Sequence, residues 1–192
     1  MKKNNLILIG IIALVVLLSV IWVVVSYNSL VSLDETVKEK WAYVLTAYQR
    51  RADLIPNLVA TVQKYTNYEG ELLTAVTEAR ASVGRASSPG QLASAGTEMN
   101  SAISRLLVVM ENYPVLKASE QFITLQDELS GTENRIKAER DIFNTAVKEM
   151  NIKVRSFPSN MVAGMFGFGL KEGFESEIGA EKALDVKELF TE

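Results

Sequence analysis

The longest run of apolar positions lies near the N-terminus. Residues 6–25 carry no charge, and a helix of that length spans about 30 Å, the hydrocarbon thickness of a bilayer. Trp22 and Tyr27 lie near its end, as expected for aromatic residues at a membrane interface. We expect a transmembrane helix at residues 6–26 after a short flank at residues 1–5, with lipid as its partner. A cleaved signal peptide is the alternative, although its apolar region is usually only roughly 7–15 residues long.

Helical periodicity continues beyond this run. From residue 30 to residue 62, apolar residues recur at steps of three or four, which predicts a helix that continues out of the membrane. Pro56 lies inside this stretch. Because proline lacks an N–H and clashes with the preceding turn, we expect a kink or a break there.

Three further helical segments are predicted, at residues 71–86, 91–112 and 115–154, with a loop at residues 87–90. The last segment has a nearly heptad spacing of apolar residues and needs a partner of similar length, which only the first helix offers. No segment shows the sustained alternation typical of strands. The sequence therefore predicts an all-α fold in which the N-terminal transmembrane helix continues into an elongated antiparallel helical bundle over residues 27–156.

Composition narrows the possible chemistry. The chain has 192 residues, a net charge of −3, and neither cysteine nor histidine. These absences exclude disulfides, thiolate nucleophiles, Ser-His-Asp triads and zinc fingers. The sequence has no clustered basic face and no phosphate-binding loop. We therefore expect no enzymatic activity, no cofactor and no nucleic-acid partner.

Charged residues interrupt the apolar stripes of the two longest predicted helices. They are Arg50, Arg51 and Asp53 in the first helix, and Glu128, Glu133, Arg135 and Glu139 in the last. In an antiparallel pair these charges form an interhelical polar layer, which fixes the register of the helices more than it adds stability. One alternative is that the charges lie on solvated faces. Another is a metal site built from the glutamates, which the lack of histidine disfavours.

Large apolar residues are also dense near the C-terminus, where they are interleaved with glycines. They are Met161, Val162, Met165, Phe166, Phe168 and Leu170. Because glycines weaken a helix, we expect no stable helix here. Residues 157–192 then form an apolar segment followed by a charged tail, which is either a weak helix or flexible. The apolar segment can cap the bundle, join neighbouring subunits or contact the membrane interface.

Several motifs follow one another in a fixed order. They are YNSLVSLDETV at 27–37, YQRRADLIPNLV at 48–59, YPVLKA at 113–118, ELSGTENRI at 128–136, ERDIFNTAV at 139–147 and SFPSN at 156–160. This ordered set resembles the bacterial LemA family. The resemblance implies a single-pass membrane protein whose soluble part is a long-helix bundle in the cytoplasm. In contrast, Lys2 and Lys3 beside the apolar run slightly favour an external bundle by the positive-inside rule.

These features predict a membrane-anchored, non-enzymatic helical scaffold in the bacterial cell membrane. We expect it to form a homo-oligomer or to dock partner proteins, including other membrane proteins. The alternative is a membrane-tethered sensory or ligand-binding bundle that acts through a separate partner.

Overall fold

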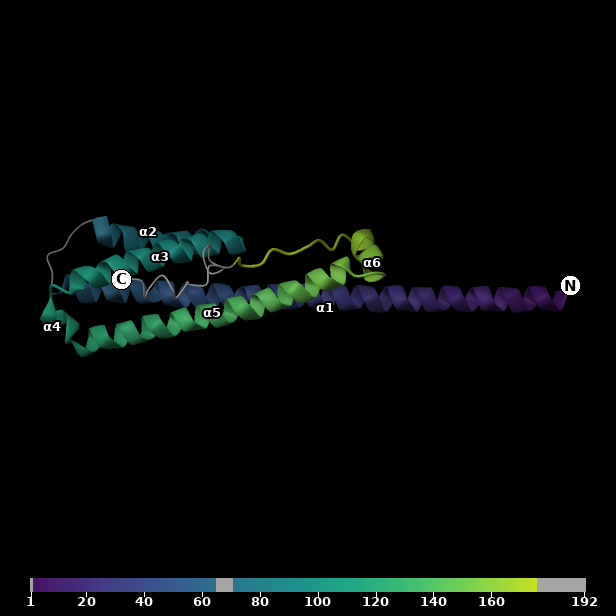
Figure 1. Cartoon of the computed structure of the whole chain (residues 1–192), viewed down its shortest axis with the longest axis horizontal. Coiled ribbons are helices and arrows are strands. Elements are labelled where there is room, and N and C mark those ends of the chain that lie inside the picture. Colours follow the sequence, from purple (N-terminus) through teal and green to yellow (C-terminus); the bar gives the residue numbers. More distant parts are fainter. Residues whose placement is uncertain (1, 65–70, 176–192) are drawn as a thin grey trace, which may run out of the picture.

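The computed structural model describes residues 2–64 and 71–175, and every regular element within them is a helix. The helices are α1 (Lys2–Gln63), α2 (Glu71–Arg85), α3 (Pro89–Met110), α4 (Pro114–Lys117), α5 (Glu120–Arg155) and α6 (Ser159–Phe166). The α1 helix extends along the whole molecule, and α5 lies antiparallel beside its C-terminal part (Figure 1). The prediction of an all-α fold with a long apolar N-terminal helix that continues into a bundle is confirmed.

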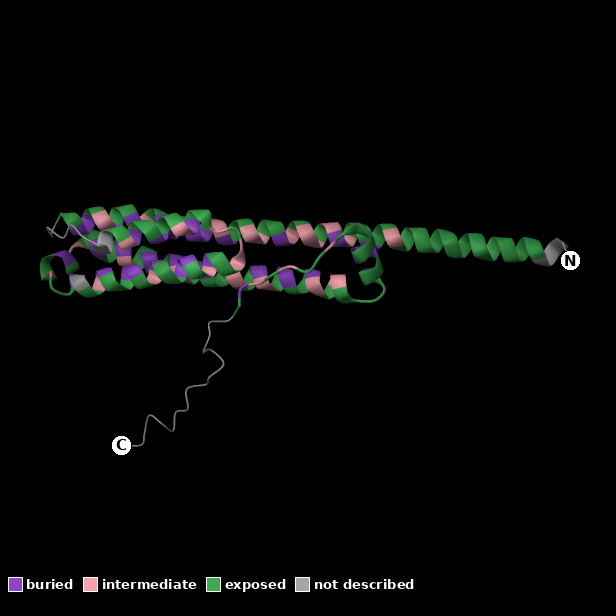
Figure 2. Ribbon diagram, turned by 90° about the horizontal axis from the view of Figure 1, so that it is seen from above, coloured by how far each residue is buried: buried purple, intermediate pink, exposed green. Residues whose placement is uncertain are grey.

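The α1 helix changes character along its length. From Leu6 to Ile21 its large apolar side chains are at least half exposed, whereas from Ser26 onward one face is buried (Figure 2). Its apolar part has a mean hydropathy of 3.2 over 18 residues. Among the described residues, α1 is the one helix long and apolar enough to cross a membrane, which is consistent with a membrane location.

Pro56 does not break α1, so of the predicted kink or break the break is wrong. The helix continues without interruption to Gln63. Pro56 itself is exposed, while Ile55 and Leu58 beside it are fully buried in the bundle. Burial of these neighbours offsets the backbone hydrogen bond that the proline removes.

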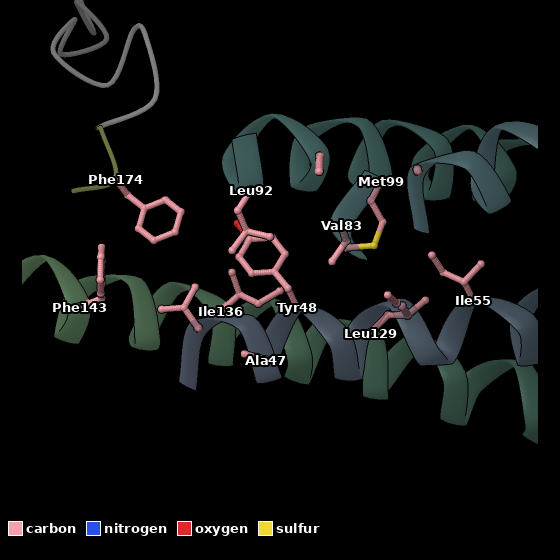
Figure 3. Packing of buried hydrophobic residues seen from close by; sticks show 14 of the residues in the cluster. Ala47, Tyr48, Ile55, Val83, Leu92, Met99, Leu129, Ile136, Phe143 and Phe174 are labelled. Atoms are coloured by element: carbon pink, nitrogen blue, oxygen red, sulfur yellow. The ribbon is translucent and has the colours of Figure 1, made fainter. Parts of the chain in front are cut away.

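The distal half of the bundle, far from the N-terminus, contains most of the core. Here α2 and α3 pack on the side of α1 that α5 leaves open (Figure 1). Tyr48 of α1 lies among apolar residues that include Leu92 and Ile136 (Figure 3). A Cβ atom at Gly96 of α3 would lie 2.7 Å from the Tyr48 ring, so a side chain at this position would have to displace the ring.

The predicted last helix is divided into α4 and α5. Ser119 lies between them in an extended conformation, and its Oγ accepts a hydrogen bond from the N–H of Phe122 at 3.4 Å. This N-cap starts a new helix. The prediction of one continuous helix over residues 115–154 was therefore wrong at its N-terminal end.

The C-terminal apolar segment is partly helical, contrary to prediction. Gly164 lies inside α6, whereas Gly167 ends the helix with a φ of 76°, in the left-handed region that favours glycine. Residues 168–175, which we call the strap, then extend back along α5 (Figure 1). The predicted charged tail beyond residue 175 lies outside the described residues.

Candidate functional site

One predicted contact between the charged clusters is present in the bundle. Arg51 of α1 forms an ion pair with Glu133 of α5. Arg51 is 6% exposed, and burial lowers the pKa of its guanidinium. Asn100 of α3 donates a hydrogen bond from Nδ2 to Oε2 of Glu133 at 3.5 Å. The Glu133 carboxylate therefore links three helices, and Asn100 is a member that the sequence analysis did not identify.

Asp53 does not face α5. Its carboxylate pairs instead with Arg80 of α2 at 3.3 Å, and both side chains are exposed. Residues two apart lie about 200° from each other around a helix, so Arg51 and Asp53 point in nearly opposite directions. An exposed pair of this kind contributes little to stability.

The other predicted residues lie around a shallow groove between α1 and α5. Arg135 pairs with the buried Glu139 of its own helix at 2.7 Å, while Arg50 and Glu128 line the groove and are exposed. The structure does not bring the predicted glutamates together. Within residues 2–64 and 71–175, no group of three or more acidic side chains is placed to hold a metal ion.

A second site, which the sequence analysis missed, holds the strap. Asn144 donates from Nδ2 to the carbonyl of Phe174 at 3.0 Å, and its Oδ1 accepts from the N–H of Phe174 at 2.8 Å. Asn151 makes the same two contacts with Lys171, at 2.9 and 2.8 Å. One amide side chain thus satisfies both backbone groups of one strap residue, as a neighbouring strand does in a sheet. We call Asn144 and Asn151 the amide clamp.

The strap also inserts an aromatic side chain between α1 and α5. Phe174 is 7% exposed, and its ring centroid lies 5.6 Å from that of Phe143 in α5 (Figure 3). The same ring centroid lies 6.1 Å from that of Trp41 in α1. The guanidinium of Arg140 covers the ring at 4.7 Å. Such a desolvated aromatic anchor is typical of residues that dominate binding energies.

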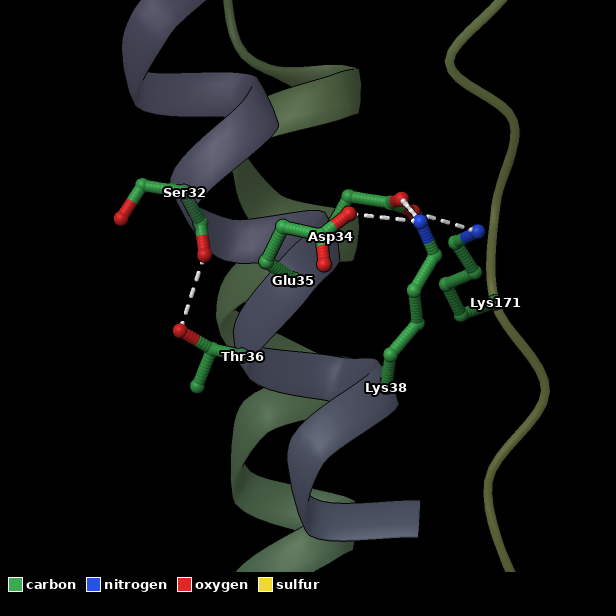
Figure 4. Close-up of polar contacts among 6 residues, drawn as sticks. All are labelled: Ser32, Asp34, Glu35, Thr36, Lys38 and Lys171. Carbon is green, nitrogen blue, oxygen red and sulfur yellow. Dashed lines mark hydrogen bonds and ion pairs between the residues drawn. The ribbon is translucent and has the colours of Figure 1, made fainter. Parts of the chain in front are cut away.

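An ion pair anchors the strap nearer to the apolar end of α1. Nζ of Lys171 lies 2.6 Å from Oδ1 of Asp34, while Lys38 pairs with the other oxygen at 2.8 Å (Figure 4). Hydrogen bonds from Lys171 and then from Lys38 lower the pKa of the Asp34 carboxyl. The strap therefore carries a Lys-x-x-Phe pattern in which both end residues are held by backbone and side-chain contacts.

The predicted apolar contact residues divide between the core and the surface. Val162 is buried and Phe168 is half-buried, whereas the others are exposed: Met161, Met165, Phe166 and Leu170. Of the predicted interface aromatics, Trp22 and Tyr27 are each 37% exposed. The Tyr27 ring lies 4.8 Å from that of Phe166 and 5.8 Å from that of Phe168.

A sequence signal for the amide clamp was present but ambiguous. Asn144 and Asn151 are seven residues apart in a helix with a nearly heptad apolar pattern, so they lie on the same face beside the stripe. The same spacing of polar residues would equally be expected on a solvent-exposed face of the helix beside the apolar stripe. The strap itself has no periodicity that would mark it as their partner.

Comparison with known proteins agrees with this architecture. The sequence profile of the LemA family matches residues 40–187, a range that includes the amide clamp and the strap. The chain is 23% identical to magnetosome protein MamQ 1 of Paramagnetospirillum magneticum over 192 residues, covering 86% of this chain and 71% of that protein. It is 26% identical to protein LemA of Metamycoplasma hominis over 140 residues, covering 71% and 63% respectively. Because the profile covers well over half of its residues, the chain belongs to the LemA family.

Proposed function

We propose that this protein is a membrane-anchored helical scaffold of the bacterial cell membrane. It crosses the bilayer once through the apolar part of α1, has no catalytic activity of its own, and self-associates or docks partner proteins through its bundle. The exposed apolar part of α1 and the similarity to magnetosome and LemA proteins support a membrane location.

The observation that carries the proposal is the way in which the strap is held. Proteins that recognise extended peptides pair with the peptide backbone and receive alternate side chains in pockets. Here the amide clamp pairs with the backbone at Lys171 and Phe174, and the aromatic side chain is inserted between two helices. The site therefore has the features of a peptide-binding groove that is filled by the protein's own chain.

Self-association follows if a neighbouring copy supplies the strap. An identical segment makes identical contacts, so exchange between copies requires no new complementarity, only a different path of the connection. Gly167 lies in this connection and Gly169 is the second residue of the strap, and a Cβ atom at either would meet nothing within 4 Å. The chain from α6 into the start of the strap is thus not locked by packing at these two glycines.

The test is the particle mass of the full-length protein in mild detergent, measured by light scattering. We expect a multiple of the 21.2 kDa chain mass. The double variant Asn144→Ala/Asn151→Ala, the variant Phe174→Ala and a deletion of residues 161–192 should each reduce it to a monomer. The control is Asn134→Ala, which alters an exposed asparagine of the same helix.

Two results would contradict the proposal in different ways. A monomeric wild-type protein would show that it does not self-associate and would leave docking of a different protein as the remaining form of a scaffold. An oligomer that persists in the clamp variants would show that the joint lies elsewhere.

A second candidate function is a sensory or ligand-binding bundle. It is favoured by the groove of 720 Å³ between α1 and α5, which is lined by charged residues of both signs, including Arg50 and Glu128. A thermal-shift screen with small zwitterionic and anionic molecules tests this function. Stabilisation that is lost in Arg50→Ala would support it.

A further inference from the structure

One end of the bundle carries a cluster of large exposed apolar side chains. The cluster, which we call the α6 patch, consists of residues that are 50–80% exposed: Phe157, Met161, Met165, Phe166 and Leu170. Isolated exposed apolar residues are common on protein surfaces, whereas a gathering on one short helix and its flanks marks an interaction site.

The α6 patch lies where α1 leaves the bundle. Both views show α6 running across the long axis of the molecule at the point beyond which α1 continues alone (Figures 1 and 2). Phe166 packs against Tyr27 at a centroid distance of 4.8 Å, and Ser26 is buried. Ser26 and Tyr27 directly follow the apolar run at residues 6–25. The patch is therefore level with the end of the segment that faces lipid if α1 crosses a bilayer.

The inner face of α6 fixes the direction of the outer face. Val162 and Ala163 are buried against the bundle. The hydroxyl of Ser159 is also buried, and its Oγ lies 2.7 Å from the carbonyl oxygen of Lys153, to which it donates. Met161 and Met165 are four residues apart and thus share a face of the helix, which is exposed. The fold therefore leaves the face of α6 that carries Met161 and Met165 exposed.

The charged residues that flank the patch along the chain are positive. Lys153 and Arg155 lie in the last turn of α5, immediately before the patch, and the sequence has no acidic residue between positions 150 and 171. A bilayer offers apolar acyl chains directly below headgroups that include anionic phosphates. An apolar face flanked by basic residues suits that boundary.

We propose that the α6 patch is a second membrane contact, in which α6 lies in the interface of the same bilayer that α1 crosses. Met161 and Met165 enter the acyl boundary, while Lys153 and Arg155 stay at the headgroups. The bundle is then held at two points, so its orientation on the membrane is fixed. This inference rests on the crossing of the bilayer by α1 and is independent of whether the strap is exchanged between copies.

The absence of native cysteine allows a direct test with single labels. Full-length Met165→Cys, labelled with an environment-sensitive fluorophore, is reconstituted into vesicles of phosphatidylcholine and phosphatidylglycerol. Quenching by nitroxide-labelled lipid is compared with quenching by aqueous iodide. The matched control is Val115→Cys in α4 at the far end of the bundle, because Val115 and Met165 are both 73% exposed. Leu14→Cys, within the apolar run, is the reference for a lipid-facing site.

We expect lipid quenching at position 165 to be several-fold stronger than at position 115, with the opposite order for iodide. Met161→Cys should behave like Met165→Cys, which guards against a local disturbance by one label. Iodide access at position 165 equal to that at position 115 would overturn the proposal. Shielding from both quenchers would also overturn it, because it would indicate a protein partner on the patch.

The reference site separates two kinds of failure. If Leu14→Cys is quenched by lipid while position 165 is in water, the patch proposal fails and the membrane anchor stands. If Leu14→Cys is not quenched by lipid, the crossing by α1 fails and the patch proposal fails with it.

Discussion

Asn144 and Phe174 exchange two hydrogen bonds although they are 30 residues apart in the sequence. The side-chain amide of Asn144 takes the position that a neighbouring peptide unit occupies in a sheet. The strap is therefore held through its backbone, as a peptide is held by a receptor, and this mode of contact has consequences that can be measured.

The variant Gly173→Ala should detach the strap. A Cβ atom at residue 173 would lie 2.8 Å from Oδ1 of Asn144, and the clamp oxygen has to stay in place to accept from Phe174. We expect faster hydrogen exchange at the amides of Lys171 and Phe174. Gly164→Ala is the control, because a Cβ atom at Gly164 meets nothing within 4 Å. Unchanged protection in Gly173→Ala would mean that the amide clamp does not determine the position of the strap.

Acid should loosen the strap through Asp34. Its folded pKa is lowered from the ordinary value of 3.8, so the contribution of this carboxylate to strap binding is present above that value and is lost as the pH falls through the folded pKa. We expect release below about pH 4. Fluorescence of Trp41, which stacks on Phe174, reports it in a Trp22→Phe background. Asp34→Asn should weaken strap binding already at neutral pH, and an unaltered acid transition in that variant would contradict the assignment.

Removal of one partner of the Arg51–Glu133 pair should destabilise the bundle. Arg51 is buried, so Glu133→Gln leaves its charge without the opposing carboxylate, and we expect a loss of about 3 kcal/mol in the free energy of unfolding. Urea denaturation of the detergent-solubilised protein measures it. The double variant Arg51→Met/Glu133→Leu should recover most of the loss. A loss below about 1 kcal/mol in Glu133→Gln would show that the pair behaves as a solvated one.

The same substitution should have opposite effects at two helical glycines. Gly96→Ala forces a methyl group against the Tyr48 ring at 2.7 Å, and overpacking of this kind costs about 1–3 kcal/mol. Gly131→Ala in α5 meets nothing within 4 Å, so the higher helix propensity of alanine should stabilise the protein by about 0.5–1 kcal/mol. Thermal unfolding compares the two variants. A stable Gly96→Ala protein would mean that the Tyr48 ring is free to move aside.

Most of the helical architecture followed from the sequence. The uncharged run at residues 6–25 is long enough for a bilayer, and the periodic apolar residues on both sides of Pro56 define one face of a single helix. The break at Ser119 was missed because a serine at an N-cap and a serine inside a helix look alike in sequence. Its extended backbone, which starts α5, is visible only in the structure.

Periodic apolar residues along the chain were enough to predict long helices that pair in an elongated bundle next to an apolar anchor, because burial periodicity is a local property of each helix. The folded structure was needed to show that Arg51 meets Glu133 while Asp53 turns to Arg80, because these contacts depend on the rotation of α1 relative to its neighbours. It alone also placed the strap on Asn144. An extended segment held by side chains has no period of its own, and its partner lies 30 residues away in the sequence.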